Sequence, residues 1–457
     1  MVLLDKILRR LNLSETKQKI VRNLFWAVTG KVVTLLGSLL VGIFVARYLG
    51  PEQYGLMQYV ISYVALFQVF ASFGLDNIEI REEAKCRSVS DTTVAPTYEI
   101  NRIIGTAFYL KLLFAAITIC AVIATAWLFE ADTFTRWMIG LYALSMVCQT
   151  FNVIRNYFTA IIWNEYIVKT EISRTVIGAF IKVVLLLLHA PLGYFIAATL
   201  FDTVLIAGGY LLSYRKKIGT PRAWTFDVPT AKYILKESFP LLLSGAAVVI
   251  YQRIDQVMIG NILDKSSVGF YSVSNSFVGV IGFIPVILSQ TISPILVQAY
   301  NTNRQDYRQK AQQFMNVTFW LTTFICVVVA LCASPIVRWT FGDAYIPAIS
   351  ILQVAVFREL FLAQAHITGT LIVTEQIQKY VVIRNVLACL VCVAGNYFLL
   401  PSVGVMGAAW CSILSAIMAG VLTHLFIPMY RHLFRMQLQS FFIGWKDMFA
   451  LKKIIKL

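Results

Sequence analysis

Charged residues are scarce in this sequence. They make up 14% of its 457 residues, whereas apolar residues make up 58%. The mean hydropathy is +0.73. A soluble globular domain carries about 25% charged residues, which keep its surface in contact with water. The composition therefore excludes an ordinary soluble protein and indicates that lipid is the main solvent of this chain.

Acidic residues are especially few, with 23 Asp plus Glu against 39 Lys plus Arg, a formal net charge of +16. In a soluble protein this excess would suggest a nucleic acid partner. In a membrane protein it has a simpler explanation, because Lys and Arg accumulate in the loops that stay in the cytoplasm. We therefore predict no nucleic acid partner.

A disulfide framework is also absent, because most of the eight cysteines fall within or at the edge of apolar stretches. Cys389 and Cys392 form a C-x-x-C in the middle of such a stretch. They have no second pair nearby, so we interpret them as packing residues rather than metal or redox groups. The sequence predicts no metal site and no cofactor.

Long polar loops are missing as well. The longest predicted exterior loop has about ten residues, and no Asp-x-Asp pair for metal-assisted sugar chemistry occurs. A membrane-embedded polymerase or glycosyltransferase needs a sizeable polar surface, so this alternative is disfavoured. We predict that the protein is not an enzyme.

Long apolar stretches are what the sequence has in abundance. Each is long enough to cross a hydrocarbon core about 30 Å thick, and pairing of every backbone N–H and C=O inside lipid requires helices. The predicted spans are 24–48, 56–75, 103–129, 137–162, 172–188, 192–213, 234–260, 270–296, 317–337, 345–373, 380–400 and 403–429. The predicted fold class is an all-α integral membrane protein with about twelve transmembrane helices.

The distribution of Lys and Arg between the loops predicts the orientation. With a cytoplasmic N-terminus, nearly all loop cations lie inside, and the outside loops hold only Arg136, Lys265 and Arg338. Both termini should then be cytoplasmic. The predicted parts are a cytoplasmic amphipathic N-terminal segment, an N-terminal six-helix bundle, a basic cytoplasmic linker, a C-terminal six-helix bundle and a basic amphipathic tail on the inner leaflet, at 1–22, 23–213, 214–236, 237–429 and 430–457.

The two halves share an architecture. A shift of 214 residues places Phe25 on Phe239 and Gly55 on Gly269 without gaps. Each half opens with a long span that ends in a short turn, L-G-P-E-Q-Y-G in one and L-D-K-S-S-V-G in the other. An even number of spans per half predicts two bundles related by a parallel pseudo-two-fold repeat.

Several charged residues fall inside the predicted spans, where a charge is costly and usually lines a watery cavity. Arg47 and Lys111 lie where their long side chains could reach the membrane interface. The predicted substrate-binding cations in a cavity are Lys31, Arg155, Lys182, Arg253 and Arg358. Because cations outnumber acids in this interior, we expect an anionic substrate, and Arg is suited to gripping phosphate oxygens.

Three other ionisable residues are candidates for coupling transport to an ion, namely Asp255, Glu359 and His366. Arg253 and Asp255 are two residues apart on one helix, which disfavours a mutual ion pair. Arg358 and its neighbour Glu359 pose the same problem. Each of these four residues is therefore expected to find another partner.

Motifs along the chain carry a family resemblance. In the first half they are N-L-F-W-A-V-T-G at 23–30, A-R-Y-L-G-P-E-Q-Y-G at 46–55, F-G-L at 73–75 and Arg81. In the second half they are E-S-F-P-L-L-L-S-G at 237–245, I-D-Q-V-M-I-G at 254–260, V-G-F-Y-S-V-S at 268–274 and G-V-M-G-A-A-W at 404–410. Their order and spacing resemble the Wzx-type polysaccharide flippases of the multidrug/oligosaccharidyl-lipid/polysaccharide exporter superfamily.

The resemblance implies a function. Such proteins move undecaprenyl-pyrophosphate-linked oligosaccharides across the bacterial inner membrane by alternating access between two six-helix bundles. It implies a lipid-linked oligosaccharide substrate, contact with membrane lipids and a possible association with a polymerase and other glycan-assembly proteins.

Two related functions stay open. A drug or cation antiporter of the same superfamily would need more acidic residues at its site than this sequence offers. A peptidoglycan-precursor flippase tends to have two further helices, for which no apolar stretch remains.

Overall fold

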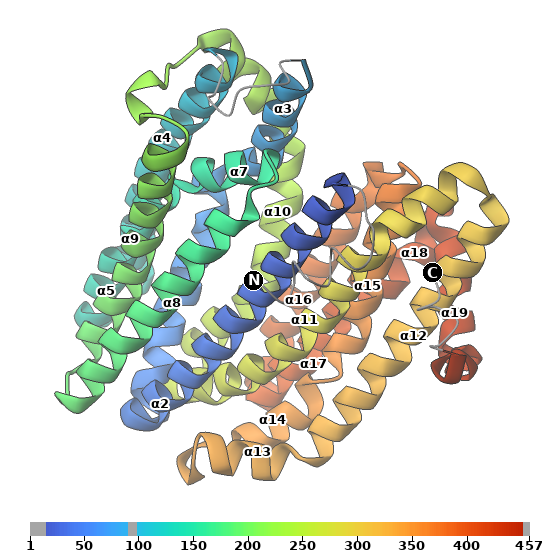
Figure 1. Ribbon diagram of the computed structural model, residues 1–457. Coiled ribbons are helices and arrows are strands. Elements are labelled where there is room, and N and C mark those ends of the chain that lie inside the picture. The colour runs from blue at the N-terminus through green and yellow to red at the C-terminus, as the bar shows by residue number, and fades with distance from the viewer. Residues whose placement is uncertain (1–14, 90–97, 451–457) are drawn as a thin grey trace. The chain divides into compact units, whose positions relative to one another are not determined.

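The computed structural model describes residues 15–89 and 98–450, and within these ranges the chain is helical and contains no strand. Figure 1 shows these helices joined by short turns. The predicted N-terminal segment 1–22 therefore lies mostly outside the described residues, as do the last residues of the predicted tail, 451–457.

The helices of the first half follow the predicted spans closely, with the fourth span divided into three pieces. They are α2 (Glu15–Ser72), α3 (Leu75–Val89), α4 (Tyr98–Phe129), α5 (Thr133–Ala143), α6 (Ser145–Gln149), α7 (Asn152–Ala160), α8 (Asn164–Leu187), α9 (Leu192–Lys217) and the 3₁₀ turn η1 (Pro221–Ala223).

The second half repeats this order. Its spans are α10 (Val228–Ile262), α11 (Lys265–Thr302), α12 (Arg304–Leu331), α14 (Ala348–Ala355) with α15 (Arg358–Thr374), α16 (Val381–Val403) and α17 (Val405–Ile417). The shorter elements are α13 (Ala333–Thr340), η2 (Asp343–Tyr345), η3 (Gln378–Tyr380), the π-helix η4 (Met418–Leu422), α18 (Thr423–Phe426), η5 (Pro428–Tyr430), α19 (Arg431–Phe442) and η6 (Gly444–Ala450).

Length and apolarity identify 10 helical segments of the described chain that could cross a membrane. One of them, Thr29–Cys86, covers most of the first predicted span and all of the second. The fifth predicted span is α8, a continuous helix of 24 residues that is too charged to count among the ten. At 1.5 Å per residue α8 is about 36 Å long, enough to cross a bilayer core. The prediction of an all-α membrane protein with about twelve spans is confirmed.

A sharp turn at Gly50 separates the first two spans, which are otherwise continuous within α2. Gly50 has φ 72° and ψ 173°, a conformation that suits a residue without a Cβ. Pro51 follows and has no N–H to continue the helical hydrogen bonds. The predicted short turn between these spans is therefore present, as is its counterpart between α10 and α11.

The chain folds into two compact units. One unit comprises Met1–Val45 and Phe67–Leu242, and the other comprises Ala46–Leu66 and Leu243–Leu457. The turn of the first half thus belongs to the second unit, and the start of α10 belongs to the first. Between the halves, α9 ends at Lys217 and α10 begins at Val228. The predicted domain boundaries remain a prediction.

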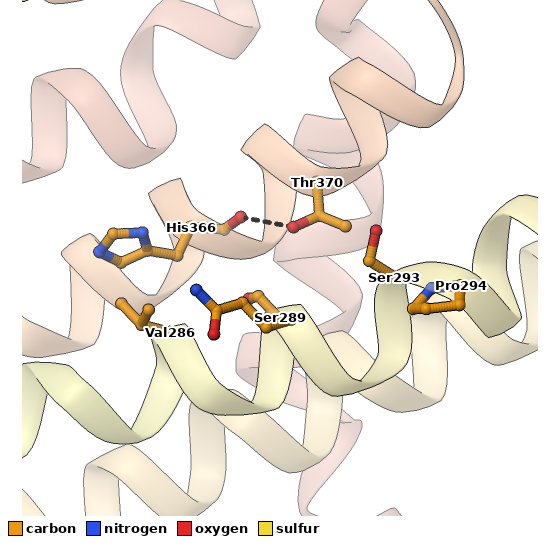
Figure 2. A pocket seen from close by; sticks show the side chains of 7 residues that line it. Val286, Ser289, Ser293, Pro294, His366 and Thr370 are labelled. Carbon is orange, nitrogen blue, oxygen red and sulfur yellow. Dashed lines mark hydrogen bonds between the residues drawn. The ribbon is translucent and has the colours of Figure 1, made fainter. Parts of the chain in front are cut away.

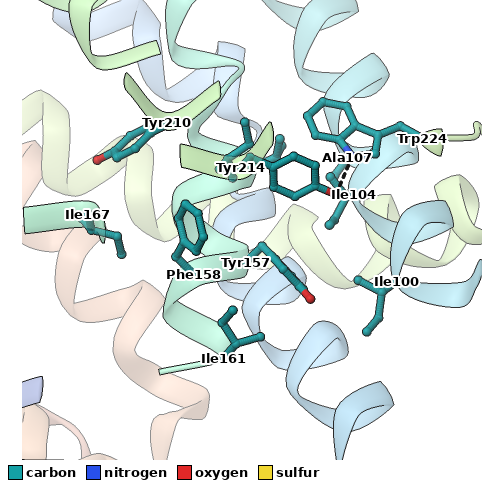
Figure 3. Close-up of a cluster of buried hydrophobic side chains, with 12 residues drawn as sticks. Ile100, Ile104, Ala107, Tyr157, Phe158, Ile161, Ile167, Tyr210, Tyr214 and Trp224 are labelled. Carbon is teal, nitrogen blue, oxygen red and sulfur yellow. Dashed lines mark hydrogen bonds between the residues drawn. The ribbon is translucent and has the colours of Figure 1, made fainter. Parts of the chain in front are cut away.

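The first unit has an aromatic core, shown in Figure 3. Tyr157 and Phe158 of α7 pack there with Tyr210 and Tyr214 of α9. Trp224, from the connector between the halves, donates a hydrogen bond from Nε1 to the Tyr214 hydroxyl over 3.1 Å. The connector is thereby anchored on the helices of this unit.

The second unit contains a close backbone contact between the two turns. A Cβ added to Gly55 would overlap the Lys265 carbonyl, and one added to Gly269 would overlap the Pro51 carbonyl. The contact is reciprocal under the shift of 214 residues, because Pro51 corresponds to Lys265 and Gly55 to Gly269. The internal repeat seen in the sequence thus appears as a symmetric contact between equivalent residues.

The C-terminal helix α19 packs against the second unit with one face. Leu433, Gln437 and Ser440 are buried, and Gln437 donates from Nε2 to the Gly420 carbonyl over 2.6 Å. On the other face Phe442 is 76% exposed, and Trp445 beyond the helix is 48% exposed. The predicted amphipathic tail is therefore held by protein contacts on one side, while its contact with lipid remains a prediction.

Candidate functional site

The fourth span is interrupted in each half. In the first half the helix breaks at Leu144 and again at Thr150, and in the second it breaks between α14 and α15. At the break between α14 and α15, the Phe357 N–H donates to the Val354 carbonyl over 3.1 Å, which is an i→i−3 hydrogen bond in place of the usual i→i−4 bond. Interrupted helices in corresponding positions of two halves are typical of substrate sites in transporters.

Arg358 and Glu359 directly follow the break in the second unit. Their side chains are only 16% and 4% exposed. Arg358 Nε lies 3.7 Å from Glu359 Oε1, so the expectation that these neighbours would not pair is wrong. The contact is too long for a hydrogen bond, and Arg358 Nε is buried without a hydrogen-bond partner. The guanidinium thus has an unused donor at the break.

Arg384 of α16 is a second cation of this site. It lies near the start of the predicted span 380–400 and was not among the predicted substrate-binding cations. In the structure its Nη1 is buried without a hydrogen-bond partner, and its Nε bonds only weakly to Asn385 Oδ1, over 3.4 Å. Tyr251 of α10 is close enough to interact electrostatically with both Arg384 and Arg358. Residues of three helices, α10, α15 and α16, therefore contribute to the electrostatic environment of this site.

Asp255 lies one turn further along α10 and is 1% exposed. It accepts hydrogen bonds from the Tyr271 hydroxyl over 2.5 Å, from Asn396 Nδ2 over 2.6 Å and from Cys392 Sγ over 3.1 Å. Asp255 is also in electrostatic range of Arg358. These three donors engage both oxygens of the Asp255 carboxyl group and fix its position beside the cationic site.

The other predicted cations are placed differently. Lys31 and Arg253 are exposed on α2 and α10. Arg155 is 49% exposed, with its Nε 3.8 Å from Glu171 Oε1. Lys182 Nζ lies 2.6 Å from Asp202 Oδ2, so its charge is compensated within the first unit. Of the five predicted substrate-binding cations, Arg358 is the one that the structure places beside a helix break with a buried, unpaired donor.

A buried ionic cluster in the first unit was not predicted from the sequence. The expectation that Lys111 reaches the membrane interface is wrong, because its side chain is 3% exposed. Its Nζ lies 2.7 Å from Asp76 Oδ1 and 2.6 Å from Glu79 Oε1. Asn156 of α7 donates to both carboxylates, over 2.8 Å and 2.6 Å.

Glu83, one turn beyond Glu79 on α3, is 1% exposed, and neither of its side-chain oxygens has a hydrogen-bond partner. The sequence feature that could have indicated this cluster is the spacing of Asp76, Glu79 and Glu83, which are three and then four residues apart. It places all three on one face of a helix. The predicted second span stops at Leu75, which left these three residues outside every predicted span.

The remaining candidate, His366 of α15, lines a pocket of about 440 Å³ in the second unit. Figure 2 shows it opposite Ser289 and Ser293 of α11, with Thr370 one turn further along α15. Among the described residues, no group of three or more His, Cys, Asp or Glu side chains is arranged to hold a metal ion.

Comparisons with known proteins agree with this architecture. A family model described as polysaccharide biosynthesis protein matches residues 20–300, more than half of the 457 residues. A second model, MatE, matches residues 240–398. Among curated protein sequences, none matches the chain significantly.

Similar solved structures include transporters of the MOP superfamily. A multidrug resistance MATE family transporter in an inward-facing conformation is 15% identical with a TM-score of 0.62, over 92% of this chain and 96% of that one. The lipid II flippase MurJ in an inward closed conformation is 14% identical with a TM-score of 0.63, over 94% and 96%. A MOP superfamily transporter from Pyrococcus furiosus is 16% identical with a TM-score of 0.58, over 96% and 97%. At these identities the likeness establishes the fold of the chain, a multi-pass membrane fold that it shares with these proteins.

Proposed function

The chain belongs to the polysaccharide biosynthesis protein family, and on that premise we propose that it is a flippase for an undecaprenyl-pyrophosphate-linked oligosaccharide. The cargo is a repeat unit of O-antigen, capsule or exopolysaccharide, which the protein moves across the bacterial inner membrane by alternating access. Both termini are cytoplasmic in this proposal. A polymerase and other glycan-assembly proteins are its partners.

The observation that carries the proposal is the pair Arg358 and Arg384. Each has a buried nitrogen without a hydrogen-bond partner. Burying a hydrogen-bond donor of a cation without an acceptor costs roughly several kcal/mol of folding free energy, unless a ligand supplies the acceptor. Phosphate oxygens are the acceptors that guanidinium groups bind best, in a bidentate, charge-assisted arrangement. The unpartnered donors on both arginines therefore support an anionic headgroup such as a pyrophosphate as the ligand.

The helix break beside Arg358 supports the transport cycle. A span whose hydrogen bonding is already interrupted between α14 and α15 can change its bend without losing a complete ladder of bonds. The Arg358 side chain would move with such a bend. We propose that this break couples headgroup binding to the change of conformation, with Asp255, Glu359 and His366 as the candidates for ion coupling.

The test is export in a bacterial strain that lacks its own flippase. We expect Arg358→Gln and Arg384→Gln each to abolish surface polysaccharide and to cause lipid-linked intermediates to accumulate, with normal amounts of protein in the membrane. The matched control is Arg338→Gln, which neutralises an exposed arginine of α13. Export at the unaltered rate by both Arg358→Gln and Arg384→Gln would refute the proposal.

One observation favours an alternative function, a cation antiporter of the same superfamily. The buried carboxylates Glu79 and Glu83, together with the half-exposed Asp76, outnumber the single buried Lys111 on this side of the unit, which is the charge balance expected of a cation site. The two functions predict different phenotypes. An antiporter would raise the resistance of the host to cationic drugs and would leave the amount of lipid-linked intermediates unchanged. The flippase would lower the amount of these intermediates and would leave drug resistance unchanged.

A further inference from the structure

The pocket of about 440 Å³ in the second unit is formed by two helices that come from different parts of the chain. Ser289 and Ser293 lie one turn apart on α11, and His366 and Thr370 lie one turn apart on α15. Figure 2 shows these side chains lining the space between the two helices. Its volume falls within the roughly 300–1,000 Å³ usual for small-molecule sites.

The lining combines two apolar residues, Val286 and Pro294, with neutral polar ones, and it holds no acid, lysine or arginine. Its polar groups are the hydroxyls of two serines and one threonine, the amide of Gln290 and the imidazole of His366. A site for an anion or a metal would carry opposite charge. Neutral groups that both donate and accept hydrogen bonds match a ligand that does the same, such as the hydroxyl groups of a sugar ring.

Ser289 indicates that the pocket takes a ligand. It is only 7% exposed, yet its Oγ has no hydrogen-bond partner. Such a hydroxyl normally bonds within its own helix when nothing else is offered, as Thr291 does by donating to the Ile287 carbonyl over 2.9 Å. Ser289 lines the pocket instead. A ligand hydroxyl there would supply the missing partner.

Pro294 adds an acceptor to the same wall. Proline has no N–H, so the Gln290 carbonyl four residues earlier lacks its usual helical donor. Gln290 itself lines the pocket. This part of α11 therefore presents a side-chain hydroxyl, a side-chain amide and a backbone carbonyl within one turn, an arrangement suited to several adjacent hydroxyl groups.

The pocket adjoins the cationic site. His366, which lines it, lies on α15 eight residues after Arg358, about 12 Å along the helix axis, and it also interacts electrostatically with Arg384. We propose that the pocket binds the sugar residue bonded directly to the pyrophosphate of the lipid-linked substrate, while the two arginines hold the pyrophosphate. This inference rests on the proposed function, and it assigns the neutral pocket of α11 and α15 to the glycan part of the cargo.

The test compares two probes on the purified full chain in detergent, with calorimetric measurement of Kd. One probe is farnesyl pyrophosphate, and the other is farnesyl pyrophosphate carrying one N-acetylhexosamine on its terminal phosphate. Ser289→Leu fills the pocket and should weaken binding of the sugar-bearing probe at least about tenfold, with less than about twofold change for the sugar-free probe. Ser289→Ala, which removes one hydrogen bond, should weaken the sugar-bearing probe about fivefold.

Two further variants keep the test decisive. Thr291→Val alters an exposed hydroxyl of the same helix that does not line the pocket, and it should leave both Kd values unchanged. Gln290→Leu changes an exposed residue and keeps the test possible if Ser289→Leu fails to fold. Equal Kd values for the two probes, or equal loss of both in the Ser289 variants, would overturn the sugar assignment while the proposed function stands. If the unaltered chain binds neither of the two probes, the proposed function itself is overturned.

Discussion

Cations buried in the described part of the chain fall into two groups according to what their side chains meet. Lys111 and Lys182 each lie within 2.7 Å of a carboxylate oxygen. Arg358 and Arg384 each keep a buried nitrogen that bonds to nothing. A donor that is left without an acceptor can bind a ligand. Arg102 and Arg174 also have such a nitrogen, so it is the helix break beside Arg358 and the electrostatic interaction of both arginines with Tyr251 that make Arg358 and Arg384 the candidates for substrate binding.

At the residue scale the lysine of the ionic cluster gives a stability prediction. Lys111→Met keeps most of the side-chain volume but leaves the fully buried Glu79 and the half-exposed Asp76 without their cation. Removing one partner of a buried ion pair costs about 3–5 kcal/mol. We expect a clearly lower midpoint of thermal unfolding for the purified protein in detergent.

The matched control for that variant is Lys310→Met. Lys310 pairs with Asp306 over 2.9 Å, and the Asp306 side chain is 42% exposed, so its loss should cost no more than about 1 kcal/mol. A Lys111→Met protein as stable as the Lys310→Met protein would mean that the cluster contributes little. Adding Asp76→Asn and Glu79→Gln to Lys111→Met should restore part of the stability, because no uncompensated charge then remains.

Sequence reasoning could place these charges along the spans but could not find their partners. Depth in a span suggested cavity lining for Lys31, Arg253 and Arg358, and of these Arg358 has a largely buried side chain while the other two are exposed; their role in binding stays a prediction. The same reasoning failed for Lys111, because the carboxylates that hold it lie on α3, beyond the predicted end of the second span. It also failed for Arg384, which lies near a span end and yet points into protein. Partners come from other helices, and hydropathy carries no information about them.

At the element scale, helix interruptions and close helix contacts shape the two units. The sequence predicted one continuous fourth span over 345–373, whereas the structure divides it into α14 and α15. Pro347 lies before this break and not within it, so the usual helix breaker does not mark the position. The reciprocal contact of Gly55 and Gly269, by contrast, follows from a motif that aligns between the halves.

That contact gives a prediction for packing. Gly55→Ala and Gly269→Ala each introduce a Cβ where a backbone carbonyl of the opposite turn already lies. Backbone cannot rotate away as a side chain can, so each variant should destabilise the protein by about 1–3 kcal/mol or more. The control is Gly279→Ala on the same helix as Gly269, where a Cβ meets nothing within 4 Å. Thermal unfolding of the three variants provides the measurement, and equal stability of all three would contradict the close contact.

At the scale of the whole molecule, the arrangement of charge between the loops predicts orientation. The connector that follows Lys217 should face the cytoplasm, and the turn between α4 and α5 should face the opposite side. We expect an epitope tag inserted after Gly219 to be hidden from antibody in intact spheroplasts, and a tag inserted after Glu130 to be accessible. The reverse pattern of accessibility would show that the predicted orientation is inverted.

The sequence by itself determined the solvent of this protein, its helical class and the approximate order of its spans. These properties depend on local composition, since about 20 consecutive apolar residues must form a helix in lipid whatever surrounds them. The repeat between the halves was visible for the same reason, because equivalent turns keep equivalent residues. The tertiary structure decided which buried charges are paired, where the fourth spans break and which polar side chains share a pocket. Those properties depend on atoms from segments far apart in the chain, such as Tyr251, Arg358 and Arg384, and only folding brings them together.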